Sequence, residues 1–352
     1  MRSLAILSVL SWVLAVTVAA RSVACHDLGF NHTRHYTRIG RNTYHYLLSK
    51  PKGPPLGTIV LLHGFPDLSY GWRYQIPSLT AAGYQVVAPD MLGYGRSSAP
   101  TNLARFTLKN MSDDLAALVR SIVGRHEQVI LGGHDWGGAL VYRAALWHPT
   151  STGASSACDA VLPADSNYVD SRQIAPASPP SFGFQRSSAT RPWRQSARHQ
   201  QDPTAPLALY GGRAPEGAFG FDGRTGLNFS NLDRLGASPL VKAAGLEYYV
   251  AEYARNTMRG PLSWFRTAEA NFKGRSWPLL RRGDDAGLNF TMPGLYIGAT
   301  MDTALRPSMS AGMERYFPEG LARGEVVSSH WALWQAAAGV NKIVGEWIAQ
   351  LA

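Results

Sequence analysis

Cysteine is nearly absent from this chain of 352 residues, which contains only Cys25 and Cys158. Two cysteines, one of them close to a predicted N-terminal cleavage point, argue against a disulfide framework. Charged residues are also sparse, at 16% of the sequence, whereas apolar residues make up 45%. These proportions are typical of a globular protein rather than a disordered one, and a chain of this length can bury a full hydrophobic core.

Clusters of basic residues are missing as well, although the formal net charge is +10. Nucleic-acid sites combine patches of Lys and Arg with aromatic side chains. Here the basic residues are spread along the chain and do not alternate with aromatics. We therefore expect no nucleic-acid partner.

The N-terminus carries the one long uncharged run of the sequence. Arg2 is followed by "SLAILSVLSWVLAVTVAA", and small residues lie around Ala20 and Ala24. A basic start, an apolar stretch and small residues are the layout of a secretory signal peptide, which we expect over residues 1–24. A membrane anchor is the alternative, since this run of 18 uncharged residues is borderline for spanning a bilayer.

Glycosylation sequons support entry into the secretory pathway. Four N-x-[ST] sequons begin at Asn31, Asn110, Asn228 and Asn289. We expect a secreted glycoprotein or a protein of the ER lumen or membrane, with any membrane association made through the N-terminus.

Strand-like and helix-like segments alternate along the chain. Short apolar runs typical of buried strands span residues 58–64, 84–90, 128–134 and 294–300. Apolar residues at helical spacing mark residues 111–124, 246–256 and 341–351. This alternation predicts an α/β fold with a mostly parallel sheet covered by helices on both faces.

A long insertion splits this pattern. We expect a core from residues 25–149 and 279–352, interrupted by a lid at 150–278. Within the lid, residues 151–205 are atypical, with six prolines and only four Val, Ile or Leu residues. A strand is expected near His148-Pro149, but "STGASSACDAVLPADS" offers little to bury. A disordered lid loop, a diverged lid and a local error in the reading frame are the three alternatives.

The stretch "LGGHDWGGAL" (131–140) has the spacing of a nucleophile elbow, a strained turn between a strand and a helix. Gly133 and Gly137 flank the central residue at a distance of two positions, where the turn tolerates little beyond glycine. The central residue is Asp135, where most such turns have serine. The alternative is a purely structural role, in which the aspartate only caps the following helix.

A carboxylate at this position indicates a particular chemistry. A serine that attacked a saturated carbon would form an ether, which water does not cleave at a useful rate. A carboxylate attacking the same carbon forms an ester, which water can hydrolyse. Asp135 therefore indicates a substrate with an sp3 electrophile, such as an epoxide or an alkyl halide.

Hydrolysis of that ester requires a water molecule activated by a histidine that an acid orients. His330 precedes the last predicted helix, and Asp302 follows the predicted strand 294–300, which matches the chain order nucleophile, acid, histidine. Two other histidines are less suited, because His148 follows the elbow helix and His199 lies in the atypical segment.

The same step develops an oxyanion, which backbone N–H groups can stabilise. Phe65 follows the His-Gly pair at the end of the first core strand, and Trp136 follows Asp135. We expect the N–H groups of Phe65 and Trp136 to form the oxyanion hole, and the Trp136 ring to contact the substrate.

At these residues the chain resembles the epoxide hydrolases of the α/β-hydrolase fold, particularly their fungal-like branch. The resemblance covers residues 35–149 and 207–350, and rests on "HGFPDLSYGWRYQIPSL", "MLGYGRSSAP", "GGHDWGG", "YYVAEYARNTMRGPLSWFR" and "HWALWQ". It implies an α/β-hydrolase core with an inserted helical lid, and no cofactor or metal. It assigns Asp135 as nucleophile, His330 as base and Asp302 as the acid that orients it.

The sequence departs from this family at two lid tyrosines, whose hydroxyls donate hydrogen bonds to the epoxide oxygen. At the matching positions this chain has Phe184, before Gln185, and Phe265, after Trp264. We expect both rings to contact the substrate, but phenylalanine cannot donate a proton. The tyrosines that could replace them are Tyr168, Tyr210, Tyr249 and Tyr253.

The resemblance thus implies a hydrolase that converts a small apolar epoxide and water to a vicinal diol, with reduced activity. A haloalkane dehalogenase is the nearest enzymatic alternative, although such enzymes usually have Asn at the position of Phe65. A catalytically silent lid protein that binds an apolar ligand is the alternative from another class, and the two phenylalanines favour it.

Overall fold

The computed structural model describes residues 28–158, 204–222, 226–273 and 289–351. Its centre is an eight-stranded sheet in the order β1-β2-β4-β3-β5-β6-β9-β10. The strands are β1 (Thr33–Ile39), β2 (Asn42–Ser49), β3 (Thr58–Leu62), β4 (Gln85–Pro89), β5 (Val129–His134), β6 (Thr152–Cys158), β9 (Gly294–Ala299) and β10 (Leu321–Val326). The pairings from β4 to β10 are parallel, whereas β1 and β2 add an antiparallel hairpin to one edge.

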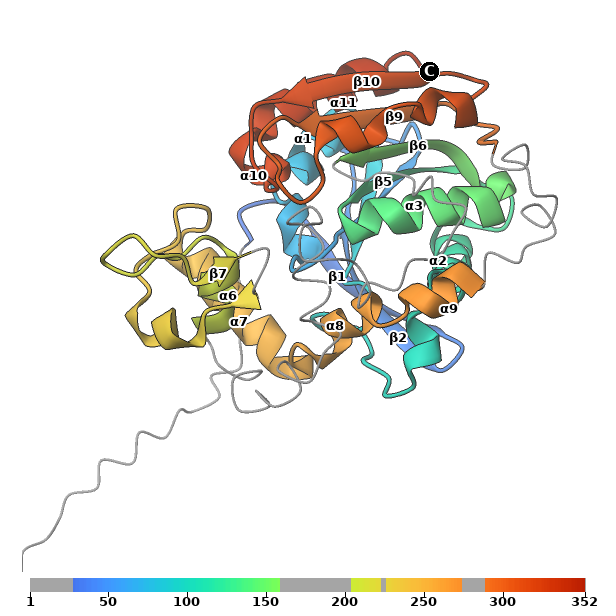
Figure 1. Cartoon of the computed structure of the whole chain (residues 1–352). Helices are drawn as coiled ribbons and strands as arrows, with labels where there is room; N and C mark the ends of the chain where they lie inside the picture. The colour runs from blue at the N-terminus through green and yellow to red at the C-terminus, as the bar shows by residue number, and fades with distance from the viewer. Residues whose placement is uncertain (1–27, 159–203, 223–225, 274–288, 352) are drawn as a thin grey trace, which may run out of the picture.

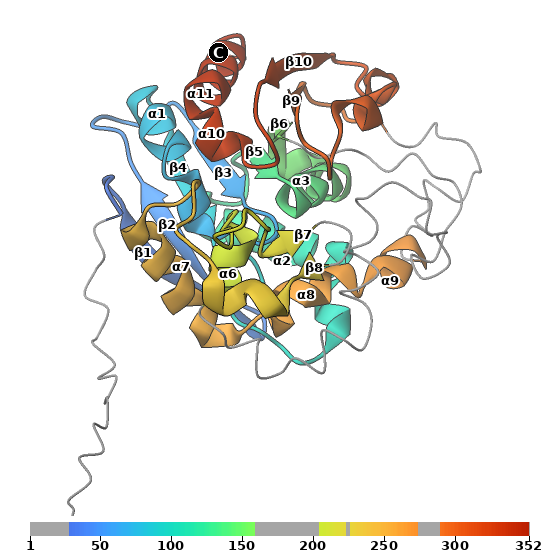
Figure 2. The ribbon, with the colours of Figure 1, turned by 60° about the vertical axis from the view of Figure 1, so that its left-hand side comes forward.

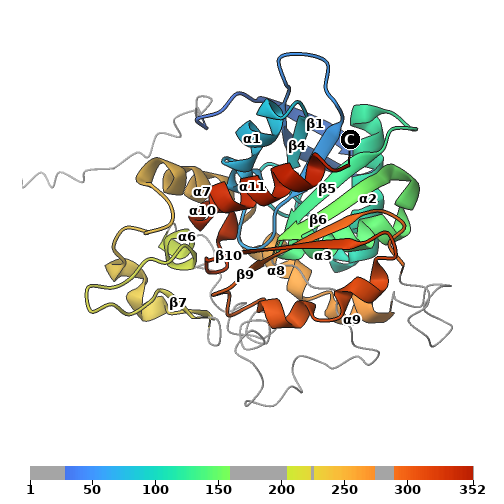
Figure 3. The same cartoon turned by 90° about the horizontal axis from the view of Figure 1, so that it is seen from above.

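Helices cover both faces of the sheet (Figure 3). On one face α3 (Trp136–Trp147) packs on β3, β5 and β6, and α2 (Leu108–Val123) packs on α3. On the other, α1 (Gln75–Ala81) packs against α11 (Ala337–Ile348), which contacts β9 and β10 and follows α10 (Ala332–Gln335). The strands between these layers are buried on both sides, and all five residues of β3 are buried. The α/β fold with a mostly parallel sheet is confirmed.

The remaining helices and small strands belong to the lid or to short connections. The lid contains α6 (Thr204–Leu209), β7 (Phe221–Asp222), β8 (Gly226–Leu227), α7 (Ala243–Asn256), α8 (Arg259–Phe265) and α9 (Ala268–Lys273). The 3-10 helices of the described ranges are η1 (Ser69–Trp72), η2 (Leu103–Phe106), η3 (Pro149–Ser151), η5 (Phe229–Arg234), η8 (Pro307–Ser310) and η9 (Met313–Tyr316). In Figures 1 and 2 the lid elements run along one side of the core, from β7 and α6 through α7 and α8 to α9.

Strand β6 is the main difference from the sequence expectation. The run from Thr152 to Cys158 lies inside the range 150–278 assigned to the lid, yet it pairs in parallel with β5 and β9 at the centre of the sheet. Two buried small residues, Ala154 and Ser155, show why few large apolar side chains are needed. Backbone hydrogen bonds on both sides hold the strand, and α3 covers it. The insertion therefore begins after Cys158 rather than at residue 150.

Candidate active site

Asp135 stands at the tip of the turn between β5 and α3. Its backbone has φ 53° and ψ −123°, one of two non-glycine residues with positive φ in the described part of the chain. A Cβ atom on Gly137 would lie 2.0 Å from the Leu62 carbonyl oxygen, and one on Gly133 would lie 2.6 Å from the Gly137 backbone. Glycine is thus required at both flanks, because the helix start and two strand ends approach closely here.

The backbone N–H of Phe65 donates to Asp135 Oδ1 at 2.7 Å. Burial raises the pKa of Asp135, while the charge of His330 and the N–H groups of Trp136 and Phe65 act to lower it. The two N–H groups expected to form an oxyanion hole therefore face the same carboxylate. Oδ1 is held by the backbone, and Oδ2 points towards His330, with 3.8 Å between Oδ2 and Nε2.

His330 and Asp302 are brought together from the loops that follow β10 and β9. Asp302 Oδ2 accepts a hydrogen bond from His330 Nδ1 at 2.8 Å, which leaves Nε2 facing Asp135. Asp302 Oδ1 accepts from the N–H groups of Ala304 at 2.6 Å and Leu305 at 3.0 Å. Burial alone would raise the pKa of Asp302, but His330 and these N–H groups lower it to about 2. Asp302 is thus an anion suited to fix the imidazole and to stabilise its protonated form.

Two further histidines support the backbone of the site. The Nε2 atom of His134 donates to the carbonyl oxygen of His330 at 2.8 Å, and burial lowers the pKa of His134 to about 3. His63 accepts from the N–H of Met91 at Nε2 (2.9 Å), so its Nδ1–H donates to the carbonyl of Gly64 (2.9 Å). Burial lowers the pKa of His63 to about 4. Both rings are therefore neutral at neutral pH.

The lid side of the site is a wall of aromatic rings. The Phe265 ring packs edge-on against Phe65 and Trp136, with centroid distances of 5.1 and 5.3 Å. Its neighbour Trp264 is buried and donates its indole N–H to the carbonyl of Leu92 at 2.9 Å, which fixes α8 on the core. Phe265 therefore lies over the two residues whose N–H groups face Asp135, and it presents carbon where a tyrosine would present a hydroxyl.

Three of the four candidate replacement tyrosines lie among the described residues, and their hydroxyls already have acceptors. The hydroxyls of Tyr210 and Tyr253 both donate to the carbonyl of Pro66, at 2.5 and 2.6 Å. The hydroxyl of Tyr249 donates to Asp67 Oδ1 at 2.6 Å. These lid tyrosines anchor the loop that carries Phe65. Tyr168, Phe184 and His199 lie outside the described residues.

Asp67 received no role from the sequence, although it lies in the quoted run "HGFPDLSYGWRYQIPSL". Its carboxylate is buried beside the site, and Oδ2 has no hydrogen-bond partner in the part of the chain that the structure describes. Burial raises its pKa to about 6, against the lowering effects of Tyr249, Leu68, Arg73 and His330. The sequence could have indicated Asp67 as a site residue, because it is an acid a few residues beyond the end of a core strand. That end lies at the same edge of the sheet as Asp135.

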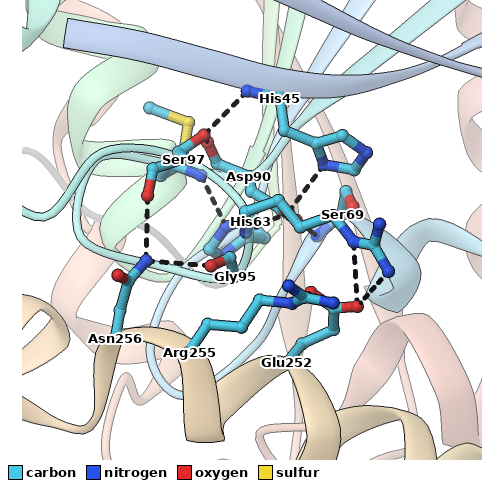
Figure 4. Close-up of polar contacts among 11 residues, drawn as sticks. His45, His63, Ser69, Asp90, Gly95, Ser97, Glu252, Arg255 and Asn256 are labelled. Carbon is cyan, nitrogen blue, oxygen red and sulfur yellow. Dashed lines mark hydrogen bonds and ion pairs between the residues drawn. The ribbon is translucent and has the colours of Figure 1, made fainter. Parts of the chain in front are cut away.

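A polar network fastens α7 to the core loop after β4 (Figure 4). Glu252, whose side chain is fully buried, accepts from Arg96 at 2.7 and 2.9 Å, and Asn256 donates to the carbonyls of Gly95 and Ser97. Behind this contact, Asp90 accepts from His45 Nδ1 at 2.7 Å and from the N–H groups of Ser69 and Arg96. The α7 part of the lid is therefore held in a fixed position on the core.

The remaining candidates contribute nothing to this site. His148 pairs with Asp113 at 2.9 Å on the far end of α3.

In the described ranges, no group of three His, Cys, Asp or Glu residues is arranged to hold a metal ion. No helix within those ranges has the length and apolar character needed to cross a membrane.

Comparison with known proteins agrees with the geometry. A family model described as alpha/beta hydrolase fold matches residues 57–337. The chain is 37% identical over 332 residues to epoxide hydrolase srdG of Neurospora crassa, covering 90% of this chain and 96% of that protein. It is 30% identical over 340 residues to bifunctional epoxide hydrolase 2 of Sus scrofa, covering 95% of this chain but 58% of that protein. The crystal structure of epoxide hydrolase A from Mycobacterium thermoresistibile superposes with a TM-score of 0.73 at 25% identity, covering 91% of this chain and 98% of that one.

Proposed function

This chain belongs to the epoxide hydrolases of the α/β-hydrolase fold, and we propose that it opens a small apolar epoxide to a vicinal diol through an ester on Asp135. The main support for this mechanism is that the two oxygens of the Asp135 carboxylate have different surroundings. Oδ1 accepts the Phe65 N–H at 2.7 Å, whereas Oδ2 faces His330 at a distance too long for a hydrogen bond. Oδ2 is therefore the oxygen available for attack.

In the first half-reaction, Oδ2 attacks an epoxide carbon and the bond from that carbon to the ring oxygen breaks. The product is an alkyl ester on Asp135 with an alkoxide on the neighbouring carbon, which requires a proton. The N–H groups at Oδ1 orient the carboxylate for this attack without taking part in the bond changes. The alkoxide lies on the lid side, where Phe265 offers no proton.

In the second half-reaction, His330 Nε2 takes a proton from water, and the resulting hydroxide attacks Cγ of Asp135. The negative charge of the tetrahedral intermediate develops on Oδ1, which already accepts the Phe65 N–H, and the Trp136 N–H faces the same carboxylate. The bond between Cγ and the alkyl oxygen then breaks, and that oxygen takes the proton from the imidazolium. The added hydroxyl leaves Asp135 protonated, and its loss of this proton restores the carboxylate and balances the proton that the first alkoxide takes up from water. Asp302, ionised at neutral pH, stabilises that imidazolium.

Trapping the ester tests this mechanism. His330→Gln removes the base for the second half-reaction, so the variant should gain the mass of one styrene oxide, and the adduct should map to Asp135. In the wild-type protein, several turnovers in 18O-water should label the Asp135 carboxylate, because hydroxide attacks Cγ. A His330→Gln variant that gains no mass, or carries the adduct on another residue, would refute the assignment.

A second candidate function rests on the aromatic wall itself. Phe65, Trp136 and Phe265 enclose the nucleophile with carbon, which suits a silent protein that binds an apolar ligand. A haloalkane dehalogenase would use the same Asp135 ester, but its leaving halide needs no proton. Three measurements distinguish an epoxide hydrolase, a haloalkane dehalogenase and a silent binding protein: turnover of an epoxide, turnover of an alkyl halide, and binding of an unreactive apolar ligand.

We also propose passage through the secretory pathway, with residues 1–24 as a signal peptide. Those residues and Cys25 lie outside the described ranges, so the support comes from the sequons. Asn31, Asn228 and Asn289 are exposed, while Asn110 is half-buried and donates to the carbonyl of Ala104. Protein from a eukaryotic host should begin near Cys25 and carry glycans at the exposed sites. An intact Met1 on unglycosylated cytosolic protein would refute this.

A further inference from the structure

A small cavity lies between the sheet and the helices α1, α10 and α11, on the face of the sheet opposite α3. Its volume is about 30 Å³, measured as the space open to the centre of a water molecule. Apolar side chains from β3, β5, β9 and α11 form most of its wall. Figures 2 and 3 show α1, α10 and α11 side by side over this face of the sheet.

Three polar side chains also line this cavity, Trp72, Gln75 and Asn341, and the first two each have an unpaired atom. Trp72, which is 4% exposed, has an indole N–H without an acceptor, and Gln75, which is 3% exposed, has an Oε1 without a donor, counting partners within the described ranges. The amide orientation of Gln75 is fixed, because its Nε2 donates to the carbonyl of Leu333 at 3.1 Å. Helical backbone at Arg73 and Tyr74 places positions 72 and 75 on the same side of the turn.

We propose that this cavity is an internal water site, in which one or two water molecules accept from Trp72 Nε1–H and donate to Gln75 Oε1. One unpaired donor and one unpaired acceptor require a ligand that can do both. A water molecule needs about 10–15 Å³ of this kind of volume and two or more polar partners. The cavity therefore suits one or two waters and is too small for an organic ligand of substrate size.

The water site lies next to the support of His330. Gln75 holds the carbonyl of Leu333 in α10, the helix that begins two residues after His330. Two parallel contacts join the same segments, since Trp334 donates to the carbonyl of Gly71 at 3.0 Å and Asn341 donates to that of Tyr74 at 3.0 Å. Water on Oε1 restrains the Gln75 amide, so Gln75 is a positioning residue for His330. This second part of the proposal rests on the proposed function.

Xenon and water occupancy test the site directly. A polar cavity holds water, whereas an apolar cavity stays dry and accepts xenon. Crystals of the wild-type protein should show ordered water bonded to Trp72 Nε1 and Gln75 Oε1, and no xenon there under pressure. The double variant Trp72→Phe, Gln75→Leu should show the reverse. Xenon in the wild-type cavity, or no density between the two side chains, would overturn the proposal. If the double variant does not fold, Trp72→Phe alone should lose the water.

The effect on His330 has a separate measurement. Gln75→Leu should slow hydrolysis of the Asp135 ester by about tenfold, since a small misplacement of a reacting group has a large effect on rate. Formation of the ester, followed in a single turnover, should change less than twofold. Leu79→Met, a swap of similar volume on the same wall, is the matched control and should change neither step. Equal losses in both steps would leave Gln75 a purely structural role. A wild-type protein without epoxide turnover would refute the proposed function but leave the water site to the crystals.

Discussion

The two sides of the active site differ in how completely their polar groups are used. On the core side, Asp302 has a partner at each carboxylate oxygen, and Asp135 Oδ1 accepts a backbone N–H. On the lid side, the ring of Phe265 packs on the rings of Phe65 and Trp136. Among the described lid tyrosines, the hydroxyls of Tyr210, Tyr249 and Tyr253 are bonded to the core loop at Pro66 and Asp67.

This difference separates the two half-reactions. In the proposed mechanism, hydrolysis of an ester on Asp135 needs a base, an orienting acid and N–H donors, and His330, Asp302 and the backbone at Phe65 are placed for these roles. Opening of the ring needs a proton at the leaving oxygen, and the lid supplies none through Phe265. Tyr210, Tyr249 and Tyr253 instead bond to the loop that carries the Phe65 N–H. The proposed mechanism therefore combines an ordered oxyanion hole with the lack of a proton donor from Phe265. Ring opening should therefore limit the rate.

The largest expected effect is on the core side. Asp302→Asn removes the anion that fixes and stabilises the His330 imidazole, so hydrolysis of the Asp135 ester should slow roughly 10³–10⁴-fold. Formation of the ester should be nearly unchanged, and mass spectrometry should show it accumulating. The control is Asp113→Asn, an exposed carboxylate that also contacts a histidine, His148, at 2.9 Å. An Asp302→Asn protein that turns over at the wild-type rate would remove Asp302 from the mechanism.

The next effect concerns the attachment of the lid. Glu252→Gln leaves Arg96 facing a neutral group in a buried pair, which should lower the free energy of unfolding by about 3–5 kcal/mol. Glu216→Gln breaks a pair with Arg234 that is about half exposed on each side, and should cost less than about 1 kcal/mol. Urea unfolding measures both. Equal losses would mean that α7 is not fastened to the core by this contact.

Phe265→Tyr tests the lid side itself and should raise the rate of ring opening. One recovered donor of this kind is worth roughly 10²–10³ in rate, or about 2.7–4 kcal/mol. The gain should be larger for an epoxide than for an alkyl halide. Phe229→Tyr, which adds a hydroxyl to another partly buried lid ring, is the control. A wild-type enzyme already as fast as Phe265→Tyr would show that another group supplies the proton.

The sequence predicted much of the core and the positions of Asp135, Asp302 and His330, because these depend on local pattern and chain order. The strand expected at 128–134 is β5 (Val129–His134), and the helix expected at 246–256 is α7 (Ala243–Asn256). The hairpin β1–β2 and strand β10 received no prediction. In β10 only Val326 of six residues is buried, so apolar patterning gives little signal there.

Partners of polar side chains were beyond the reach of the sequence. Tyr210 and Tyr253 are 43 positions apart, yet their hydroxyls meet at the carbonyl of Pro66. No local pattern encodes that meeting, because it depends on how α6 and α7 pack on the core. The assignment of β6 to the lid was wrong for a related reason. This strand is stabilised by two neighbouring strands and a covering helix rather than by its own apolar residues.

The smallest predicted effect is the pH dependence that Asp67 gives to stability. Its folded pKa of about 6 lies above the ordinary value of 3.8, so the folded state holds a proton that the unfolded state has lost between these values. Stability from this group is therefore present below pH 4 and is lost as the pH rises through 6. This difference corresponds to about 3 kcal/mol. Asp302, whose folded pKa is about 2, has the opposite sign and loses its contribution as the pH falls below 4.

Asp67→Asn separates the two carboxylates. The free energy of unfolding of the wild-type protein, minus that of Asp67→Asn, should fall by about 3 kcal/mol between pH 4 and pH 7, measured by urea unfolding. The same subtraction with Asp233→Asn, an exposed lid aspartate, should stay flat. A flat difference for Asp67 as well would mean that its buried carboxylate is ionised as easily as an exposed one. The Tyr249 hydroxyl would then stabilise the charge far more than its single hydrogen bond implies.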